Sequence, residues 1–280
     1  MGRWFTYIKE RFQLIPQIIL VGGLTLIAKP QQDSWVTLGS VFFSLLLFFF
    51  LLRAMDEYKD YEKDCVAHPE RPLPQGLISR NEMKNLIELL ILGMVGGSVF
   101  LGSALSLATG LMYLIVTAYL WAMFHEFNLK SFLSKRPLIY ALSHQFIVVP
   151  LSAFLIAARG GKSIYSIDTL LISMVLFGGF FAYEICRKLD PKAHPILKTY
   201  PRIYGIIPTA ILAGGAVFIL SLCGYFLGIS RILWPIGILL LAALIYYCCS
   251  PAKFKAAEKI SVVNLLACIY SLAIKTVVMS

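Results

Sequence analysis

Residues 53–79 read RAMDEYKDYEKDCVAHPERPLPQGLIS, and they follow the apolar run LLLFFFLL directly. Asp56, Asp60 and Asp64 recur every four residues, with Glu57 beside the first of them. If the apolar helix continues through this stretch, these carboxylates leave one face of the helix, one turn apart. Carboxylates in this arrangement at the end of an apolar helix predict a site for Mg²⁺ held against a bound phosphate.

The composition of the chain is that of a membrane protein. Its 280 residues are 59% hydrophobic and only 14% charged, with a mean hydropathy of +0.78, whereas soluble domains average about 25% charged residues. The polar stretches are all short, so we expect one all-α, polytopic domain over residues 1–280. The net charge of +10 lies in loops between apolar runs and not in a basic stripe with aromatic residues, so we expect no nucleic-acid partner.

Nine transmembrane helices are expected from apolar runs of about 17 to 25 residues, the length that crosses a bilayer. They fall near residues 14–28, from 35 into the acidic stretch, and near 84–105, 107–129, 137–158, 165–187, 204–228, 231–249 and 260–279. Pro16 and the pair Gly22-Gly23 are expected to kink or soften the first of these helices.

The distribution of Lys and Arg predicts the orientation of these helices. With the N-terminus in the cytosol, 20 of the 25 Lys and Arg residues lie in cytosolic segments and four in outer loops, which agrees with the positive-inside rule. The stretch 53–79 and a second polar cluster, from Glu184 to Tyr204, are therefore both expected at the cytosolic surface, where they can converge. We expect an integral, multi-pass protein of the cell or inner membrane.

The acidic stretch resembles a family motif. The pattern DExxDxxxD from Asp56, followed by RPLPQGLIS from Arg71, resembles the first aspartate-rich motif of the UbiA superfamily of intramembrane prenyltransferases, NDxxDxxxD followed by RPLPxGxIS. Gly76 and Ser79 stand at the family spacing, whereas Asp56 replaces the usual Asn and Glu57 the usual Asp. Nine helices with cytosolic motifs after the second and the sixth are also similar to the family's helical bundle, so the resemblance covers essentially the whole chain.

The second polar cluster departs from the family pattern, which often reads NNxRDxxxD and then KxTLxxxxG. When Arg187 and Thr199 are aligned with the family's Arg and Thr, Lys188 and Lys192 occupy both aspartate positions. Three consequences are open. Nearby carboxylates replace the second metal's ligands, the lysines bind the diphosphate directly, or the protein keeps the fold without ionising an allylic diphosphate.

The resemblance implies an Mg²⁺-dependent enzyme that transfers a polyprenyl group from a prenyl diphosphate to an aromatic or other lipophilic acceptor inside the lipid bilayer. The residues expected to carry this chemistry are acidic or basic and lie in the cytosolic segments. We expect Asp56, Glu57, Asp60 and Asp64 to be catalytic; Asp60, Asp64, Glu57, Glu184 and Asp190 to bind the metal; and Arg53, Lys59, Arg71, Lys135, Arg136, Arg187, Lys188 and Lys198 to bind the substrate.

Two other functions stay open at the level of the sequence. The lysines of the second cluster are also consistent with a UbiA-fold protein that binds or moves a prenylated lipid without catalysis. A third possibility within the superfamily is a transferase that moves another activated group, such as a phosphoribosyl, onto a polyprenyl phosphate.

Further polar residues near the membrane boundary have ordinary explanations. The pair His125-Glu126, at the end of the fourth predicted helix, is expected to be solvated at the interface, with contact to a substrate head group as the alternative. His144, inside the fifth, is expected to make an interhelical hydrogen bond.

Overall fold

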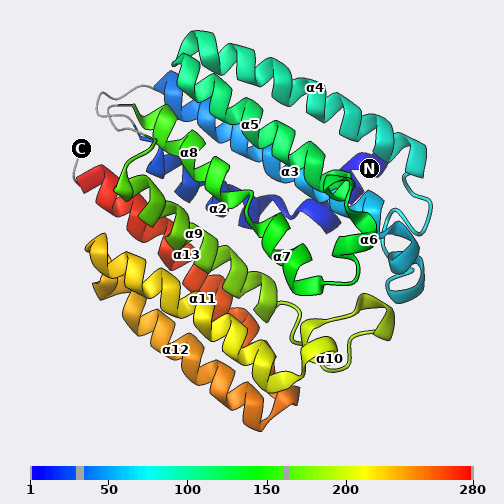
Figure 1. Cartoon of the computed structure of the whole chain (residues 1–280). Helices are drawn as coiled ribbons and strands as arrows, with labels where there is room; N and C mark the ends of the chain where they lie inside the picture. The colour runs from blue at the N-terminus through cyan, green and yellow to red at the C-terminus, as the bar shows by residue number, and fades with distance from the viewer. Residues whose placement is uncertain (1, 30–34, 161–163, 279–280) are drawn as a thin grey trace. The chain divides into compact units, whose positions relative to one another are not determined.

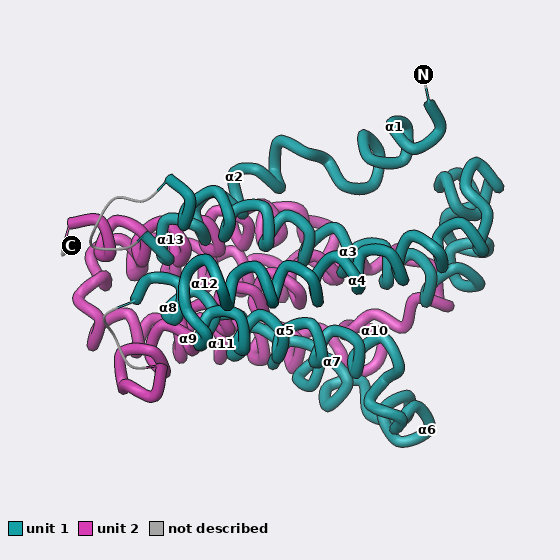
Figure 2. Tube along the Cα trace, turned by 90° about the horizontal axis from the view of Figure 1, so that it is seen from above, with its two compact units in different colours: residues 1–161 teal, residues 162–280 magenta. Residues whose placement is uncertain are grey.

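The computed structural model describes residues 2–29, 35–160 and 164–278, and within these ranges the chain forms helices and no strands (Figure 1). Residues 1–161 and 162–280 form two compact units, which Figure 2 distinguishes by colour. The all-α prediction is confirmed. The prediction of a single domain over residues 1–280 stays a prediction.

The first unit is a ring of long helices that closes on itself. Helix α2 packs on α3, α3 on α4, α4 on α5, α5 on α8 and α8 again on α2, and α3 also contacts α5 and α8. Figure 1 shows α3, α4 and α5 lying side by side. The elements are α1 (Arg3–Tyr7), the π-helical segment η1 (Ile8–Phe12), α2 (Leu14–Ile27), α3 (Trp35–Ala67), α4 (Arg80–Ala104), α5 (Leu107–Phe124), η2 (Glu126–Asn128), α6 (Lys130–Leu133), α7 (Pro137–Gln145) and α8 (Val148–Arg159).

The second unit is a four-helix ring. Helix α9 packs on α11, α11 on α12, α12 on α13 and α13 again on α9. A short segment between α9 and α11 carries the second polar cluster. The elements are α9 (Ile167–Cys186), η3 (Pro195–Leu197), α10 (Tyr200–Tyr204), α11 (Ile206–Phe226), α12 (Ser230–Cys249), η4 (Pro251–Lys253) and α13 (Lys255–Val278).

The predicted membrane spans match these helices closely. By length and composition, eight helices of the described residues can cross a membrane, or nine if the bent pair Arg3–Phe12 and Leu14–Ile27 forms one span. The bend of 59° in that pair falls at Gln13, whose φ of 48° is left-handed, and not at Pro16 or the glycine pair. The prediction of a kink at Pro16 was therefore wrong, because a proline in the first turn of a helix lacks only a donor that would have no helical partner there.

Helix α3 carries the chain's central feature. It runs without interruption for 33 residues, so the apolar span and the acidic motif belong to one helix. At 1.5 Å per residue this length is about 50 Å, about 20 Å more than the hydrocarbon core of a bilayer. The acidic end of α3 therefore extends beyond the apolar layer, as the sequence predicts.

The RPLP segment after α3 forms a compact turn. Leu73 and Ile78 are buried beneath it, and Gly76 adopts a φ of 75°, a conformation that favours glycine. The turn ends in a capping box at the start of α4, where the Ser79 hydroxyl accepts from the Glu82 amide and the Glu82 carboxylate accepts from the Ser79 amide. Glu82 also pairs with Arg3 at 2.5 Å.

Helices α4 and α5 meet through a glycine contact. The Ser106 side chain caps α5 by accepting from the Thr109 amide, and α5 then returns along α4. A Cβ atom on Gly110 would lie 2.5 Å from the Ser98 carbonyl oxygen and 2.7 Å from the Gly102 Cα, whereas one on Gly102 would lie 3.8 Å from the nearest atom. Only Gly110 is therefore essential to this approach.

We expect Gly110→Ala to lower the free energy of unfolding by about 1–3 kcal/mol, because the added methyl group forces the two backbones apart. Thermal unfolding of the purified protein in detergent measures this change. Gly102→Ala is the matched control, and it should change the stability little. Equal melting temperatures for the two variants would contradict the predicted backbone contact.

Candidate active site

Glu57 is buried at the acidic end of α3 and is held by two arginines. Its Oε1 atom lies 2.6 Å from Nη2 of Arg11 and 2.5 Å from Nη2 of Arg53. Arg11 comes from η1, so this carboxylate fastens the N-terminal segment to α3. A buried carboxylate requires such pairing, because an unpaired charge in an apolar setting is costly.

Asp64 is also buried and paired with an arginine. Its Oδ2 atom accepts a hydrogen bond from Nη1 of Arg71 at 2.6 Å, and Arg71 is the first residue of the RPLP segment. The side chain that the sequence predicts to bind a metal therefore fastens the following turn to the helix. The predicted substrate ligands Arg53 and Arg71 are likewise engaged with carboxylates.

Asp56 and Asp60 lie on the more open side of α3. Asp60 pairs with Lys63 at 2.8 Å, but both side chains are about half exposed, at 50% and 54%, and such pairs are weak. Asp56 is exposed and contributes to a small cavity of about 10 Å³, lined also by Leu52, Met55 and residues of α5 and α7. These two acids, one helical turn apart, are the most accessible of the predicted metal ligands and catalytic residues.

Lys59 extends into the space between α3, α5 and α7. Its ammonium group donates to the Met123 carbonyl oxygen and to the Tyr140 hydroxyl, each at 3.2 Å, and lies 3.6 Å from Oε1 of Glu126. The ring of His144 stacks on that of Tyr140 with a centroid distance of 4.0 Å. This polar group lines the same small cavity as Asp56.

The turn that presents Glu126 has an unusual backbone. Glu126, Phe127 and Asn128 have φ values of 52°, 54° and 58°, so three consecutive non-glycine residues are left-handed. This conformation costs free energy, and it persists where surrounding contacts hold it, often at functional sites. Phe127 is held by the rings of Tyr119 and His144, at 5.4 and 5.9 Å.

The sequence did not predict the contacts that this turn makes. Glu126, which we expected to be solvated, is largely buried against Lys59. Nδ1 of His144 lies 2.9 Å from the Tyr140 carbonyl oxygen of its own helix, and the predicted interhelical hydrogen bond stays a prediction. No sequence motif marked Tyr140 as a candidate site residue. The one usable signal was an acid and a lysine on segments that the topology places at the same membrane surface.

The remaining predicted cations of the first unit lie between α6 and α7. Lys135 and Arg136 are both exposed, and the guanidinium of Arg136 lies 4.1 Å from the centre of the Phe132 ring. The structure places them on the surface, outside the contacts around Lys59. They are accessible to an anionic group.

In the second unit, the Glu184 carboxylate forms ion pairs with two cations at the C-terminal end of its own helix, α9. The carboxylate lies 2.5 Å from Arg187 and 2.6 Å from Lys188. The ammonium of Lys188 also lies 5.5 Å from the centre of the Tyr200 ring. Burial raises the pKa of the Tyr200 phenol above its usual range, and the charge of Glu184 adds to this shift. Tyr200 is therefore a neutral donor beside two cations.

Asp190 and Lys198 lie farther along the same segment. Oδ1 of Asp190 accepts from the Lys192 amide at 2.8 Å, which forms a tight turn. The preceding residue, Leu189, is fixed by a hydrogen bond from Tyr247 to its carbonyl oxygen. Lys198 is exposed and has a left-handed φ of 45°. Because the Asp190 carboxylate is engaged in this turn and Lys198 is exposed, the segment presents cations more readily than carboxylates.

The fit to Mg²⁺ can be judged from the donors. Within the described residues no group of three or more His, Cys, Asp or Glu side chains is placed to hold a metal ion. Mg²⁺ is usually bound by one or two carboxylates together with substrate phosphates and water, and not by a complete protein cage. Asp56 and Asp60 fit that mode, because they offer carboxylate oxygens on an accessible face.

Comparison with known proteins identifies the family. A model of the UbiA prenyltransferase family matches residues 17–269. The chain belongs to this family. Digeranylgeranylglyceryl phosphate synthase of Methanospirillum hungatei JF-1 is 29% identical over 164 residues, which are 57% of this chain and 54% of that protein. The match thus spans about half of the relative's length.

A solved structure shares the fold of this UbiA-family member. It is described as "Structural and mechanistic insights into the biosynthesis of Digeranylgeranylglyceryl phosphate synthase in membranes", and it superposes with a TM-score of 0.67 and 18% identity over 99% of both chains. The resemblance predicted from the acidic motif is therefore confirmed, and so is the UbiA-like helical architecture. The protein is an integral, multi-pass membrane protein.

We expect Arg71→Ala to lower the free energy of unfolding by about 3–5 kcal/mol, because it leaves the Asp64 carboxylate buried without its cation. Lys63→Ala, which removes a cation from the half-exposed Asp60, is the matched control and should cost no more than about 1 kcal/mol. Thermal unfolding in detergent compares the two. If Arg71→Ala is no worse than Lys63→Ala, Arg71 does not anchor the turn.

Proposed function

We propose that this UbiA-family prenyltransferase moves a polyprenyl group from a prenyl diphosphate to a lipophilic acceptor at the cytosolic membrane surface. The observation that carries the proposal is the uninterrupted helix α3, which brings Asp56 and Asp60 directly from an apolar span to the membrane boundary. A prenyl diphosphate has the same division, since its chain is apolar and its head is a polyanion.

Asp56 and Asp60 are the residues we propose to hold Mg²⁺. When bound, Mg²⁺ supplies positive charge that neutralises the diphosphate as it departs from the allylic carbon. Glu57 and Asp64 hold the segments around this pair in place, because their ion pairs with Arg11 and Arg71 fix η1 and the RPLP turn against α3. In this proposal they act by positioning the motif, and a role as metal ligands would require them to leave those arginines.

Lys59 is proposed as a second contact for the diphosphate. Its ammonium donates to two neutral oxygens, those of the Met123 carbonyl and the Tyr140 hydroxyl, and lies 3.6 Å from Glu126, in the same cavity as Asp56. The apolar side chains around it, including Leu52 and Leu120, exclude water, which protects a reactive allylic cation from hydrolysis. The small cavity has room for about one water molecule, so the substrate head must displace these side chains to enter.

The second polar cluster, considered within its own unit, is proposed to bind phosphate with cations and without a second metal. Glu184 is already paired with Arg187 and Lys188, and Asp190 is engaged in a turn. The two cations outnumber their shared carboxylate, so the cluster is net positive and suits a polyanion. Among the three consequences of the altered motif, this one agrees best with the observed pairing.

The orientation is part of the proposal. In the topology predicted from the sequence, 20 of the 25 Lys and Arg residues fall in cytosolic segments, as the positive-inside rule requires. The substrate would therefore enter from the cytosolic leaflet.

The relative's name indicates the acceptor to test first. Digeranylgeranylglyceryl phosphate carries two geranylgeranyl groups on a glyceryl phosphate, so its synthase adds such a group to a phosphate-bearing lipid. We propose geranylgeranyl diphosphate and geranylgeranylglyceryl phosphate as the first donor and acceptor. The exposed Lys135 and Arg136 suit a phosphate head group. An aromatic acceptor is the second class to test.

We expect Asp60→Asn to reduce Mg²⁺-dependent turnover by about 100-fold or more, since it removes charge that stabilises the departing diphosphate through the metal. The measurement is release of diphosphate from labelled geranylgeranyl diphosphate by the protein in lipid bilayers. Glu62→Gln, an exposed acid of the same helix, is the control and should keep wild-type turnover. Unchanged turnover and Mg²⁺ dependence in Asp60→Asn would remove Asp60 from the site.

We expect Lys188→Gln to raise the KM for the prenyl diphosphate by about 10-fold, the effect of losing one charge-assisted contact, and to leave the Mg²⁺ requirement unchanged. Glu184→Gln should also leave the Mg²⁺ requirement unchanged. If Glu184→Gln instead increases the Mg²⁺ concentration needed for half-maximal turnover, Glu184 holds a second metal and the cationic role of this cluster is wrong.

The non-catalytic function makes a different prediction in the same assay. A protein that only binds a prenylated lipid would release no diphosphate from any donor chain length, and the lipid would be recovered intact after purification. That outcome, with both acceptor classes supplied, would overturn the proposed transfer.

A further inference from the structure

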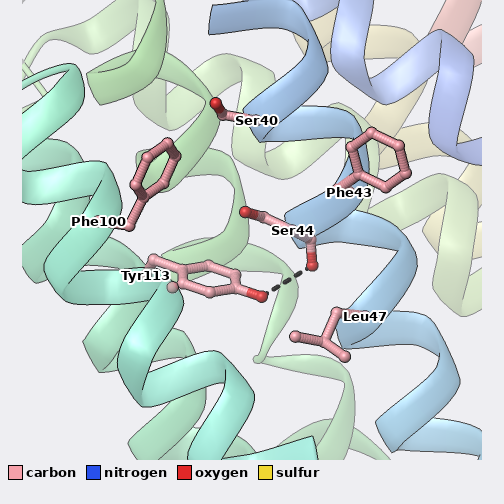
Figure 3. A pocket seen from close by; sticks show the side chains of 7 residues that line it. Ser40, Phe43, Ser44, Leu47, Phe100 and Tyr113 are labelled. Atoms are coloured by element: carbon pink, nitrogen blue, oxygen red, sulfur yellow. Dashed lines mark hydrogen bonds between the residues drawn. The ribbon is translucent and has the colours of Figure 1, made fainter. Parts of the chain in front are cut away.

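A second cavity lies in the first unit, far along α3 from the acidic motif. It has a volume of about 370 Å³ between α3, α4 and α5, which is in the range of small-molecule sites. Figure 3 shows its walls, formed by Ser40, Phe43, Ser44, Leu47, Phe100 and Tyr113. Gly97 completes the lining and leaves room where a side chain would stand.

The cavity opens on the surface of the first unit. Phe43 and Phe100, which flank it, are 69% and 54% exposed, although both lie in membrane-spanning helices. Exposed side chains at this depth contact lipid chains. The back of the cavity is firm, because Tyr113 is buried and donates to the Ser44 carbonyl oxygen at 2.8 Å.

The Ser40 hydroxyl of α3 makes the cavity more than an apolar groove. Serine and threonine side chains in membrane helices usually donate to the carbonyl four residues earlier, as Thr25, Ser98 and Ser152 do here. Across the ranges that the structure describes, the Ser40 hydroxyl has no hydrogen-bond partner, whereas the Ser44 side chain is hydrogen-bonded with Tyr113. Figure 3 shows both pointing from α3 towards the side of Phe100 and Tyr113.

The depth of the Ser40 hydroxyl indicates what it binds. Trp35, which is 86% exposed, begins α3, and tryptophan at a helix end marks the membrane–water interface. Ser40 lies five residues farther along, about 8 Å into the membrane at 1.5 Å per residue. Ser44 is one turn deeper, still about 18 Å along the helix from Asp56. The Ser40 hydroxyl thus lies near the level at which a glycerolipid joins its chains to glycerol.

We propose that this cavity is a binding site for one glycerolipid of the surrounding bilayer. One lipid chain lies between Phe43 and Phe100 and runs towards Leu47. The oxygen that links this chain to glycerol accepts from Ser40, while Ser44, one turn deeper, keeps its bond with Tyr113 at the back of the cavity. The site lies on the membrane half opposite the acidic motif, so it is distinct from the site of the transfer reaction.

Photolabelling in bilayers tests this site. The full chain is placed in lipid nanodiscs that contain phosphatidylcholine with a diazirine in mid-chain, irradiated, digested and analysed by mass spectrometry. We expect several times more adducts at Phe43 and Phe100 than at Leu92, which is equally exposed on α4 but outside the cavity. Equal labelling at all three residues would overturn the proposal.

Two variants sharpen the test. Gly97→Leu fills the cavity and should reduce labelling at Phe43 and Phe100 to the level of Leu92. Gly96→Leu, the neighbouring exposed glycine with no atom within 4 Å of its Cβ position, should leave the enrichment unchanged. Persistent enrichment in Gly97→Leu would overturn the site.

A third variant tests the proposed lipid site even if Gly97→Leu does not fold. The substitution Ser40→Ala keeps the packing and should lower the enrichment about fivefold, the factor that one net hydrogen bond is worth. Unchanged enrichment would refute the role of the hydroxyl. Enrichment seen only with a photoactivatable prenyl diphosphate, and not with phosphatidylcholine, would instead assign the cavity to a substrate and overturn the lipid assignment.

Discussion

A carboxylate buried at the end of a membrane helix has to be neutralised where it stands, and this requirement organises the first unit. Glu57 takes Arg11 from η1 and Arg53 from its own helix, while Asp64 takes Arg71 from the following turn. The pairs join three segments of the chain at the acidic end of α3. Because removing one partner leaves a buried charge, these pairs hold local structure in place even if their net contribution to stability is small.

The acids of one motif are therefore divided between two tasks. Glu57 and Asp64 are buried and face cations of the protein, whereas Asp56 and Asp60 remain on the accessible side. The helical period explains the division, since residues four apart drift by about 40° around the helix axis and neighbouring residues by about 100°. A helix packed on one side buries some of these directions and leaves the others open.

The second cluster shows how a charge reversal is accommodated. In the alignment predicted from the sequence, Lys188 stands where the family pattern has a carboxylate; in the structure Arg187 and Lys188 both pair with Glu184. Two cations and one acid make a locally positive segment, held by the Tyr247 contact with Leu189. The two polar clusters thus differ in kind: the first presents accessible acids, and the second presents cations.

The sequence by itself determined the class of the protein, its membrane spans and its family, because hydrophobic length and the spacing of Asp56, Asp60, Arg71 and Gly76 are properties of the chain read in order. Only the tertiary structure decided which acids are engaged, because Arg11 and Glu57 are 46 residues apart and meet through packing. The contact of Lys59 with Tyr140, 81 residues away, likewise depends on packing. The left-handed turn at Glu126 contains no glycine, so its sequence does not predict that conformation. The spacing of charges predicted where the chemistry lies, but partners distant in sequence set the environment of each charge.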